Sequence, residues 1–273
     1  RYEGFVADRA VLTAEITRMK KQTEMPKATK KADGLGLVFD PDPRTTLADA
    51  TLQDTSPPDA FANAYVTRTL RDLTIDGDGN FLLRGPWCEI AQYSSPFSAA
   101  STTADGNWTA QRGDNAFNDA MTYFHIDQSQ RYIQSLGFTG EKGIQQRVLG
   151  VDTDALGGQD QSVFSSDVNG LQFGHGCVDD NEDADVILHE YGHAMHYGID
   201  PNYLFDRGDH GGMSEGFGDY WAASYSLRTT NGRSFHPEWV FSWDGHGDPV
   251  DCWGGRVANA TDTRYNPNFD YGA

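Results

Sequence analysis

The sequence predicts an α+β fold, because strand signals and helix signals fall in separate stretches of the chain. Residues 34–113 are rich in Thr, Asp, Gly and Pro and hold short β-type runs, and extended runs return in residues 148–174. Residues 114–136 place their apolar side chains mostly on one face of a helix, with Gly137 as a stop. Two more helix-like segments lie beyond residue 184. We therefore expect a β-rich part followed by a helical part.

Length and charge limit the function classes. A chain of 273 residues allows one large domain or two lobes. The formal net charge of −19 at pH 7 repels nucleic acids and anionic membranes and favours a cation-binding protein. No apolar run approaches the roughly 18 residues that a membrane span needs. We expect neither a nucleic-acid partner nor a membrane span.

The clearest chemical signal is the run His189-Glu-Tyr-Gly-His193. Residues four apart on an α-helix are offset by only about 40°, so these two imidazoles can face one ion. Glu190 comes one residue after the first histidine, where it can reach a water on that ion without binding the ion itself. The flanking apolar stripe predicts a helix, and Asp179 with Glu182 predicts a capping box in front of it.

A second helix-like segment, residues 212–222, supplies two acidic side chains one turn apart, Glu215 and Asp219. Two histidines and one glutamate form a ligand set that leaves a fourth zinc position open for water. The sequence therefore predicts a zinc centre with His189, His193 and Glu215 as ligands. Asp219 would accept the spare N–H of a ligating histidine and fix its tautomer.

The two segments together resemble the gluzincin zinc metallopeptidases, the thermolysin-like group, and more closely its fungalysin-like branch. Residues 34–43, 120–138 and 173–185 also resemble stretches of bacterial members, so the likeness covers most of the chain from about residue 34. The resemblance implies a thermolysin-like two-lobed fold. Its β-rich N-terminal lobe would span residues 34–183, and residues 184–273 would form the zinc helix and the start of a helical C-terminal lobe.

The resemblance also implies a secreted zinc endopeptidase that acts on protein or peptide substrates. Zinc would polarise the peptide carbonyl and lower the pKa of its bound water to around 7. Glu190 would act as general base toward that attacking water and return the proton to the leaving amine. Gln161 and Ser162 would lie on an exposed strand edge that pairs with the substrate backbone, although the family usually has Asn at the first position.

The relatives have one further histidine, which assists the developing oxyanion, well downstream of the third zinc ligand. A stretch similar to residues 262–271 precedes it there, and this chain ends at Ala273. We therefore expect the helical lobe to be incomplete here and to be completed by a further or separate C-terminal fragment. The alternative function is a catalytically weak or inactive relative with a structural or binding role. A metal hydrolase acting on a non-peptide substrate is a third class.

Calcium is an open second cofactor. Asp185 lies four residues before His189 and matches a calcium ligand of thermolysin-like enzymes. The region where the other carboxylates of that site would lie instead holds Ser224, Tyr225 and Ser226.

Residues 1–33 become basic toward their end and contrast with the acidic remainder. They resemble the last strand of a propeptide followed by a linker, with cleavage near Lys30 and Lys31. The other interpretation is an N-terminal strand and exposed linker of the mature enzyme.

Some residues outside the two zinc segments give weaker signals. The three cysteines allow one disulfide and one free thiol or three reduced thiols, and any disulfide is expected to join Cys177 to Cys252. His125 sits off the apolar stripe of its helix and is expected at the surface or as a cap. Residues 76–80 predict a tight turn rather than a calcium loop.

Overall fold

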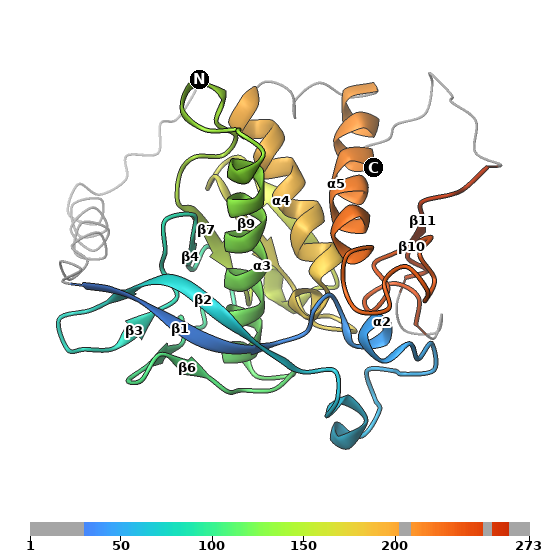
Figure 1. Ribbon diagram of the computed structural model, residues 1–273, viewed down its shortest axis with the longest axis horizontal. Helices are drawn as coiled ribbons and strands as arrows, with labels where there is room; N and C mark the ends of the chain where they lie inside the picture. The colour runs from blue at the N-terminus through green and yellow to red at the C-terminus, as the bar shows by residue number, and fades with distance from the viewer. Residues whose placement is uncertain (1–29, 202–208, 248–252, 262–273) are drawn as a thin grey trace, which may run out of the picture.

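The computed structural model describes residues 30–201, 209–247 and 253–261, and confirms the α+β class (Figure 1). The strands are β1 (Lys30–Val38), β2 (Val66–Ile75), β3 (Phe81–Leu82), β4 (Cys88–Ile90), β5 (Thr102–Thr103), β6 (Asn107–Trp108), β7 (Leu149–Asp152), β8 (Ser162–Ser165), β9 (Gly170–Phe173), β10 (Trp239–Val240) and β11 (Arg256–Val257). The α-helices are α2 (Pro43–Leu47), α3 (Asn115–Ser135), α4 (Ala184–Ile199) and α5 (Asp209–Ser226). Short 3₁₀ helices are η1 (Pro58–Phe61), η2 (Gly140–Lys142), η3 (Leu156–Gly158) and η4 (Asp180–Glu182). None of the described helices is long and apolar enough to cross a membrane.

The first sheet has the strand order β5-β3-β2-β1-β6, with β1 and β2 antiparallel. Strand β1 begins at Lys30, so residues 30–33 belong to this sheet although they precede the expected boundary at residue 34. The predicted turn at residues 76–80 is confirmed, since the backbone N–H of Asp76 donates to the carbonyl of Asn80 at 3.0 Å.

The second sheet has the order β4-β7-β9-β8. Its first three strands are parallel, and the residues of β7 and β9 are all buried, as expected for central parallel strands. Strand β8 pairs antiparallel with β9 and forms one edge of the sheet. The sheet therefore presents β8 as an edge beside α4, which it contacts.

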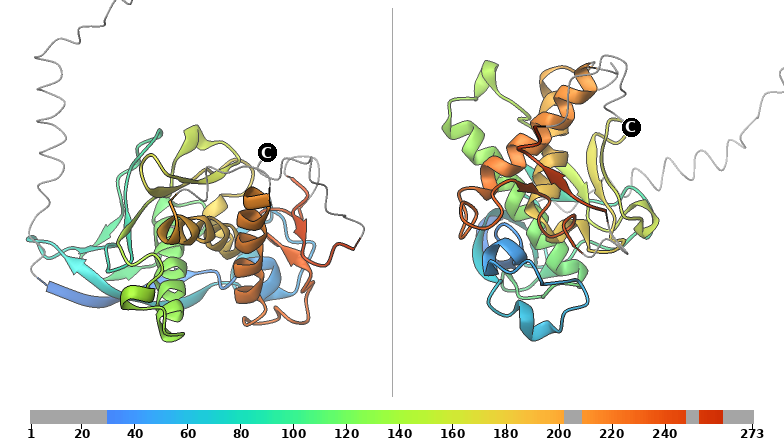
Figure 2. Two further views of the ribbon diagram at one scale, coloured as in Figure 1. Left: turned by 90° about the horizontal axis from the view of Figure 1, so that it is seen from above. Right: turned by 90° about the vertical axis from the view of Figure 1, so that its right-hand side faces the viewer.

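Helix α3 matches the predicted helix to within one residue at each end, and Asp114 caps it by accepting the N–H of Ala116 at 2.9 Å. The expectation that His125 lies at the surface is wrong. His125 is fully buried, with Nε2 3.0 Å from the carbonyl oxygen of Phe39. Because α3 packs against β1 on one side and α4 on another, residues off the apolar stripe are covered as well (Figure 2).

Helix α4 begins differently from the sequence prediction. Its N-cap is Asp183, whose carboxylate accepts the N–H of Asp185 at 2.9 Å. The expected capping box of Asp179 and Glu182 is therefore wrong. Asp179 precedes η4, and the Glu182 carboxylate is buried and accepts bonds from Arg112 Nε and from a tryptophan indole instead.

The cysteines follow the first of the two expected patterns. Cys177 is in a disulfide, whereas Cys88 is a buried free thiol. Cys252, the other half of the expected pair, lies outside the described residues, as do residues 1–29 and the stretch 262–271. The residues expected to flank the propeptide cleavage, Lys30 and Lys31, are described and form the start of β1.

Candidate metal centre

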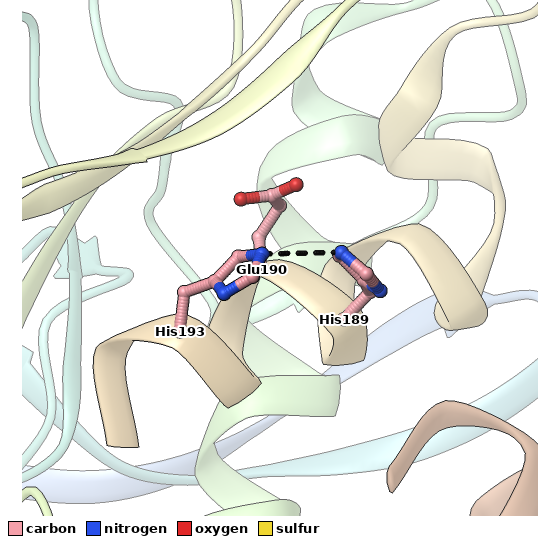
Figure 3. A group of neighbouring side chains, drawn as sticks. All are labelled: His189, Glu190 and His193. Atoms are coloured by element: carbon pink, nitrogen blue, oxygen red, sulfur yellow. Dashed lines mark hydrogen bonds between the residues drawn. The ribbon is translucent and has the colours of Figure 1, made fainter. Parts of the chain in front are cut away.

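The imidazoles of His189 and His193 meet on one face of α4. Their Nε2 atoms lie 3.2 Å apart, and the rings cross at nearly a right angle with centroids 4.8 Å apart (Figure 3). The spacing of four residues puts both side chains on one face of the helix, as predicted. His189 is only 5% exposed and His193 is half-buried, so the two imidazoles lie largely below the protein surface.

Glu215 reaches this pair from α5. Its Oε2 lies 3.3 Å from His189 Nε2 and its Oε1 lies 3.4 Å from His193 Nε2. A tetrahedral zinc site with bonds of about 2.0–2.2 Å has neighbouring ligand atoms about 3.3–3.6 Å apart. The spacing of the three side chains therefore fits one zinc-sized cation between them.

Each imidazole also has its other nitrogen engaged. Asp219 Oδ1 lies 2.9 Å from His189 Nδ1, as predicted, and Ser214 Oγ lies 2.7 Å from His193 Nδ1. If each Nδ1 carries the proton and donates it, the Nε2 lone pairs face the candidate metal position. Ser214 was missed at the sequence level, although its place directly before Glu215 was a signal. Its hydroxyl also lies 3.2 Å from His196 Nδ1.

The charges of the site favour a cation. The pKa of His189 is raised to about 9: burial lowers it, but the hydrogen bonds to Asp219 and Glu215 outweigh burial. The pKa of Glu215 is lowered, because its bonds to the two histidines outweigh the effect of its own burial. The carboxylates of Glu215 and Asp219 thus favour a positive charge at the imidazoles, and a metal cation can take the place of the proton.

Glu190 stands beside the two imidazoles, with its carboxylate on the same side of α4 (Figure 3). One ligand atom each from His189, Glu190 and His193 lie within 4.8 Å of one another, so Glu190 competes with Glu215 as the third ligand. We favour Glu215, because its two oxygens approach both Nε2 atoms within 3.4 Å. Glu190 is 8% exposed and its Oε2 has no hydrogen-bond partner among the described residues, so this oxygen can accept a bond from water.

A cavity of about 210 Å³ opens in front of His189 and Glu190. Gln161 and Ser162, the expected substrate-binding residues, both line it at the start of the edge strand β8. The backbone of Gln161 is already engaged, since its N–H donates to Gln159 and its carbonyl accepts from Gly174. The Ser162 hydroxyl donates to Asp180, another residue of the cavity wall.

Arg256 on β11 also lines this cavity and was missed in the sequence. Its Nη1 lies 2.8 Å from Asp219 Oδ1, and its Nη2 lies 3.2 Å from Glu215 Oε2. The guanidinium is held over the rings of Phe241 and Trp253 at 5.4 and 5.8 Å. Arg256 therefore fixes the two carboxylates of α5 from a segment far along the chain.

Asp185, the expected calcium ligand, accepts hydrogen bonds from within the protein at both of its oxygens. Its Oδ1 accepts the hydroxyl of Ser226 at 2.5 Å, and its Oδ2 accepts the N–H of Phe241 at 3.0 Å. The serine in place of a carboxylate thus acts as a hydrogen-bond donor to Asp185, and both oxygens of Asp185 already accept one bond within the protein.

The chain matches no protein-family model and no curated protein. We therefore infer its function from the side chains of the site and from the cavity in front of them.

Proposed function

We propose that this protein is a zinc-dependent endopeptidase whose metal is held by His189, His193 and Glu215. One observation supports this most directly. Two helices bring two imidazole nitrogens and a carboxylate to within 3.2–3.4 Å of one another, the spacing of neighbouring zinc ligands. The donor set of two histidines and one glutamate leaves one position open for reaction.

A bound zinc ion supplies a Lewis acid for the peptide carbonyl and lowers the pKa of a bound water to around 7. Glu190 takes a proton from the attacking water and returns it to the leaving amine. Its unpartnered, buried Oε2 supports this role, because no described side chain competes for that oxygen. Asp219 and Ser214 hold the imidazoles in position throughout.

The substrate in this proposal is a peptide in the cavity beside β8. An exposed strand edge offers backbone groups to an extended peptide, which explains recognition of the main chain rather than one side chain. Gln161 and Ser162 stand at the point where this edge meets the cavity.

The proposal includes a thermolysin-like two-lobed fold and membership of the fungalysin-like branch. A β-rich part that includes α3, followed by the packed helices α4 and α5, supports the fold. We also propose that the protein is secreted. The disulfide at Cys177 supports this, because disulfides persist mainly in oxidising compartments.

The test is zinc content together with peptidase activity on casein, before and after a zinc chelator. We expect about one zinc per chain, and activity that disappears on chelation and returns with zinc. Glu190→Gln should keep the zinc and lose about 100- to 10,000-fold in rate. Full activity in Glu190→Gln, or activity indifferent to the chelator, would show that this site does not cleave the peptide.

One observation favours the second candidate, a zinc protein of this kind without turnover. The two described histidines downstream of α5 do not line the cavity. His246 Nε2 lies 3.0 Å from the carbonyl oxygen of Arg256, and His236 stacks on Trp239 with centroids 3.7 Å apart. One bound zinc with no hydrolysis of casein or short peptides would support this candidate.

A further inference from the structure

A second group of potential ligands lies in the wall of the same cavity. Asp160, Asp180 and Asp244 each offer one carboxylate oxygen, and these oxygens lie within 4.8 Å of one another. The three residues come from separate segments: the loop before β8, helix η4, and the stretch after β10. The fold therefore brings three carboxyl groups to one point that the zinc chemistry does not use.

Two of these carboxylates are buried and only half satisfied. Asp180 is 3% exposed and Asp244 is 5% exposed. Asp180 Oδ2 accepts the Ser162 hydroxyl, and Asp244 Oδ2 accepts the indole N–H of Trp253 at 2.7 Å. The Oδ1 atoms of both have no hydrogen-bond partner among the described residues. An unpaired buried acceptor is costly, so these two oxygens favour a bound water or cation.

The electrostatics of these three carboxyl groups also favour a bound cation. Burial and the neighbouring Asp183 carboxylate raise the pKa of Asp244 to about 7. Burial and Asp244 raise the pKa of Asp180 well above its usual range. Asp160 at the exposed rim adds a third charge. A bound cation relieves this mutual repulsion and fills the open coordination of both buried oxygens.

We propose that Asp160, Asp180 and Asp244 form a calcium site beside the candidate zinc centre. Calcium takes oxygen ligands at 2.3–2.6 Å, so oxygens on opposite sides of one ion lie up to about 4.6–5.2 Å apart. The 4.8 Å limit on the three carboxylate oxygens falls within that span. An all-oxygen set with three carboxylates favours calcium over zinc, and over magnesium, which usually keeps several waters and one or two carboxylates.

The ion would join three parts of the cavity wall. Asp160 precedes Gln161, Asp180 accepts from Ser162 at the edge of β8, and Asp244 follows the segment that contacts the start of α4. Calcium would therefore fix β8 relative to the zinc helix. Calcium binding at this site does not depend on peptide hydrolysis. A failure of the proposed peptidase function would therefore leave this proposal unaffected, and the reverse also holds.

Terbium luminescence tests the site directly. Terbium replaces calcium at oxygen sites, and the Trp253 indole that donates to Asp244 is close enough to sensitise its emission. With the zinc-loaded protein, we expect sensitised emission that calcium abolishes by competition. Asp244→Asn should weaken terbium and calcium binding at least about tenfold and leave the zinc content unchanged. Asp78→Asn, a matched change on the exposed turn at residues 76–80, should alter neither.

The variant Trp253→Phe distinguishes loss of the residue that sensitises the emission from loss of calcium binding. It should lower the sensitised emission while calorimetry still detects calcium binding. The absence of calcium-sensitive emission from folded, zinc-loaded protein would overturn the proposal, and so would equal calcium affinity in wild type and Asp244→Asn. A third outcome also overturns it: no calcium binding, with Asp160→Asn selectively slowing cleavage beside Lys or Arg. That result would make the cluster a subsite for basic side chains.

Discussion

In both ligand histidines, the hydrogen bond at Nδ1 determines that Nε2 faces the candidate metal position. His189 Nδ1 is held by Asp219 at 2.9 Å, and this carboxylate is itself held by Arg256. Partners of this kind raise the basicity of the ligand and typically contribute 10–100-fold to metal affinity. The orientation of His189 therefore depends on residues from two later segments.

We predict that Asp219→Ala weakens zinc affinity by about 10- to 100-fold, because His189 loses the acceptor that sets its tautomer. Competition with a chromophoric zinc chelator measures the effect. Asp219→Ala also removes the ion pair between Asp219 and Arg256. Arg256→Ala is the control for that loss, since it leaves the bond between His189 and Asp219 in place. Tyr220→Ala truncates a neighbouring exposed side chain and should change nothing. An unchanged affinity in Asp219→Ala would contradict the assigned role of this carboxylate.

The sequence revealed the residues of the site that lie within one helix turn of each other. The spacings of His189 to His193 and of Glu215 to Asp219 are helical, so each pair could be predicted to share a face. Arg256 could not be predicted, because it reaches Asp219 from 37 residues away through a short strand. Asp180 and Asp244 lie far apart in the sequence, and only the folded chain brings their carboxylates together.

At the scale of elements, the metal centre depends on how closely α4 and α5 approach. A Cβ atom on Gly192 would lie 3.0 Å from the Cα of Gly218, so the two backbones meet where both residues lack a side chain. A Cβ on Gly218 would also lie 2.6 Å from His189 Nδ1. The glycine in α5 therefore makes room for the ligand imidazole.

We predict that Gly218→Ala lowers zinc affinity at least about tenfold, because the added methyl group displaces His189 from Asp219. The matched control is Gly216→Ala in the same helix, where a Cβ meets nothing within 4 Å. That variant should keep its zinc and gain up to about 1 kcal/mol in stability from helix propensity. Zinc titration and thermal unfolding of both variants check the pair. Equal zinc affinities would show that the helices can move apart without cost.

The elements themselves were more predictable than their junctions. The periodicity of α3 and the two zinc segments gave helices close to those observed, since an apolar stripe is a local signal. The capping box failed because Glu182 is drawn away by Arg112 from a different part of the chain. The order of strands in the two larger sheets has no counterpart in sequence spacing, because the pairs β1–β6 and β4–β7 join segments that are distant along the chain.

At the scale of the whole molecule, buried carboxylates join the parts of the fold. Asp183 Oδ2 accepts the backbone N–H groups of Trp243 at 2.9 Å and Asp244 at 3.0 Å. Asp42, the N-cap of α2, is also buried and lies in the field of Asp183. The net charge of −19 is thus carried partly inside the protein, where acidic groups act as acceptors for neighbouring backbone. This arrangement makes stability depend on pH.

Asp42 determines the direction of one such dependence. Burial and the neighbouring Asp183 raise its pKa from 3.8 to about 7 in the folded protein, and its Oδ2 has no partner among the described residues. Between these values the folded state holds a proton that the unfolded state has released. The free energy of unfolding therefore falls as pH rises through this window and is constant above it.

We predict that Asp42→Asn removes this fall in the free energy of unfolding with rising pH, because asparagine also caps a helix but carries no charge. From pH 5 to pH 8, the free energy of unfolding of the variant should gain on the order of 2 kcal/mol relative to wild type. Urea unfolding at the two pH values measures it. Asp114→Asn, the same replacement at the exposed N-cap of α3, should differ from wild type equally at both. If Asp42→Asn behaves like Asp114→Asn, Asp42 is ionised in the folded protein at pH 5, and its burial does not limit stability.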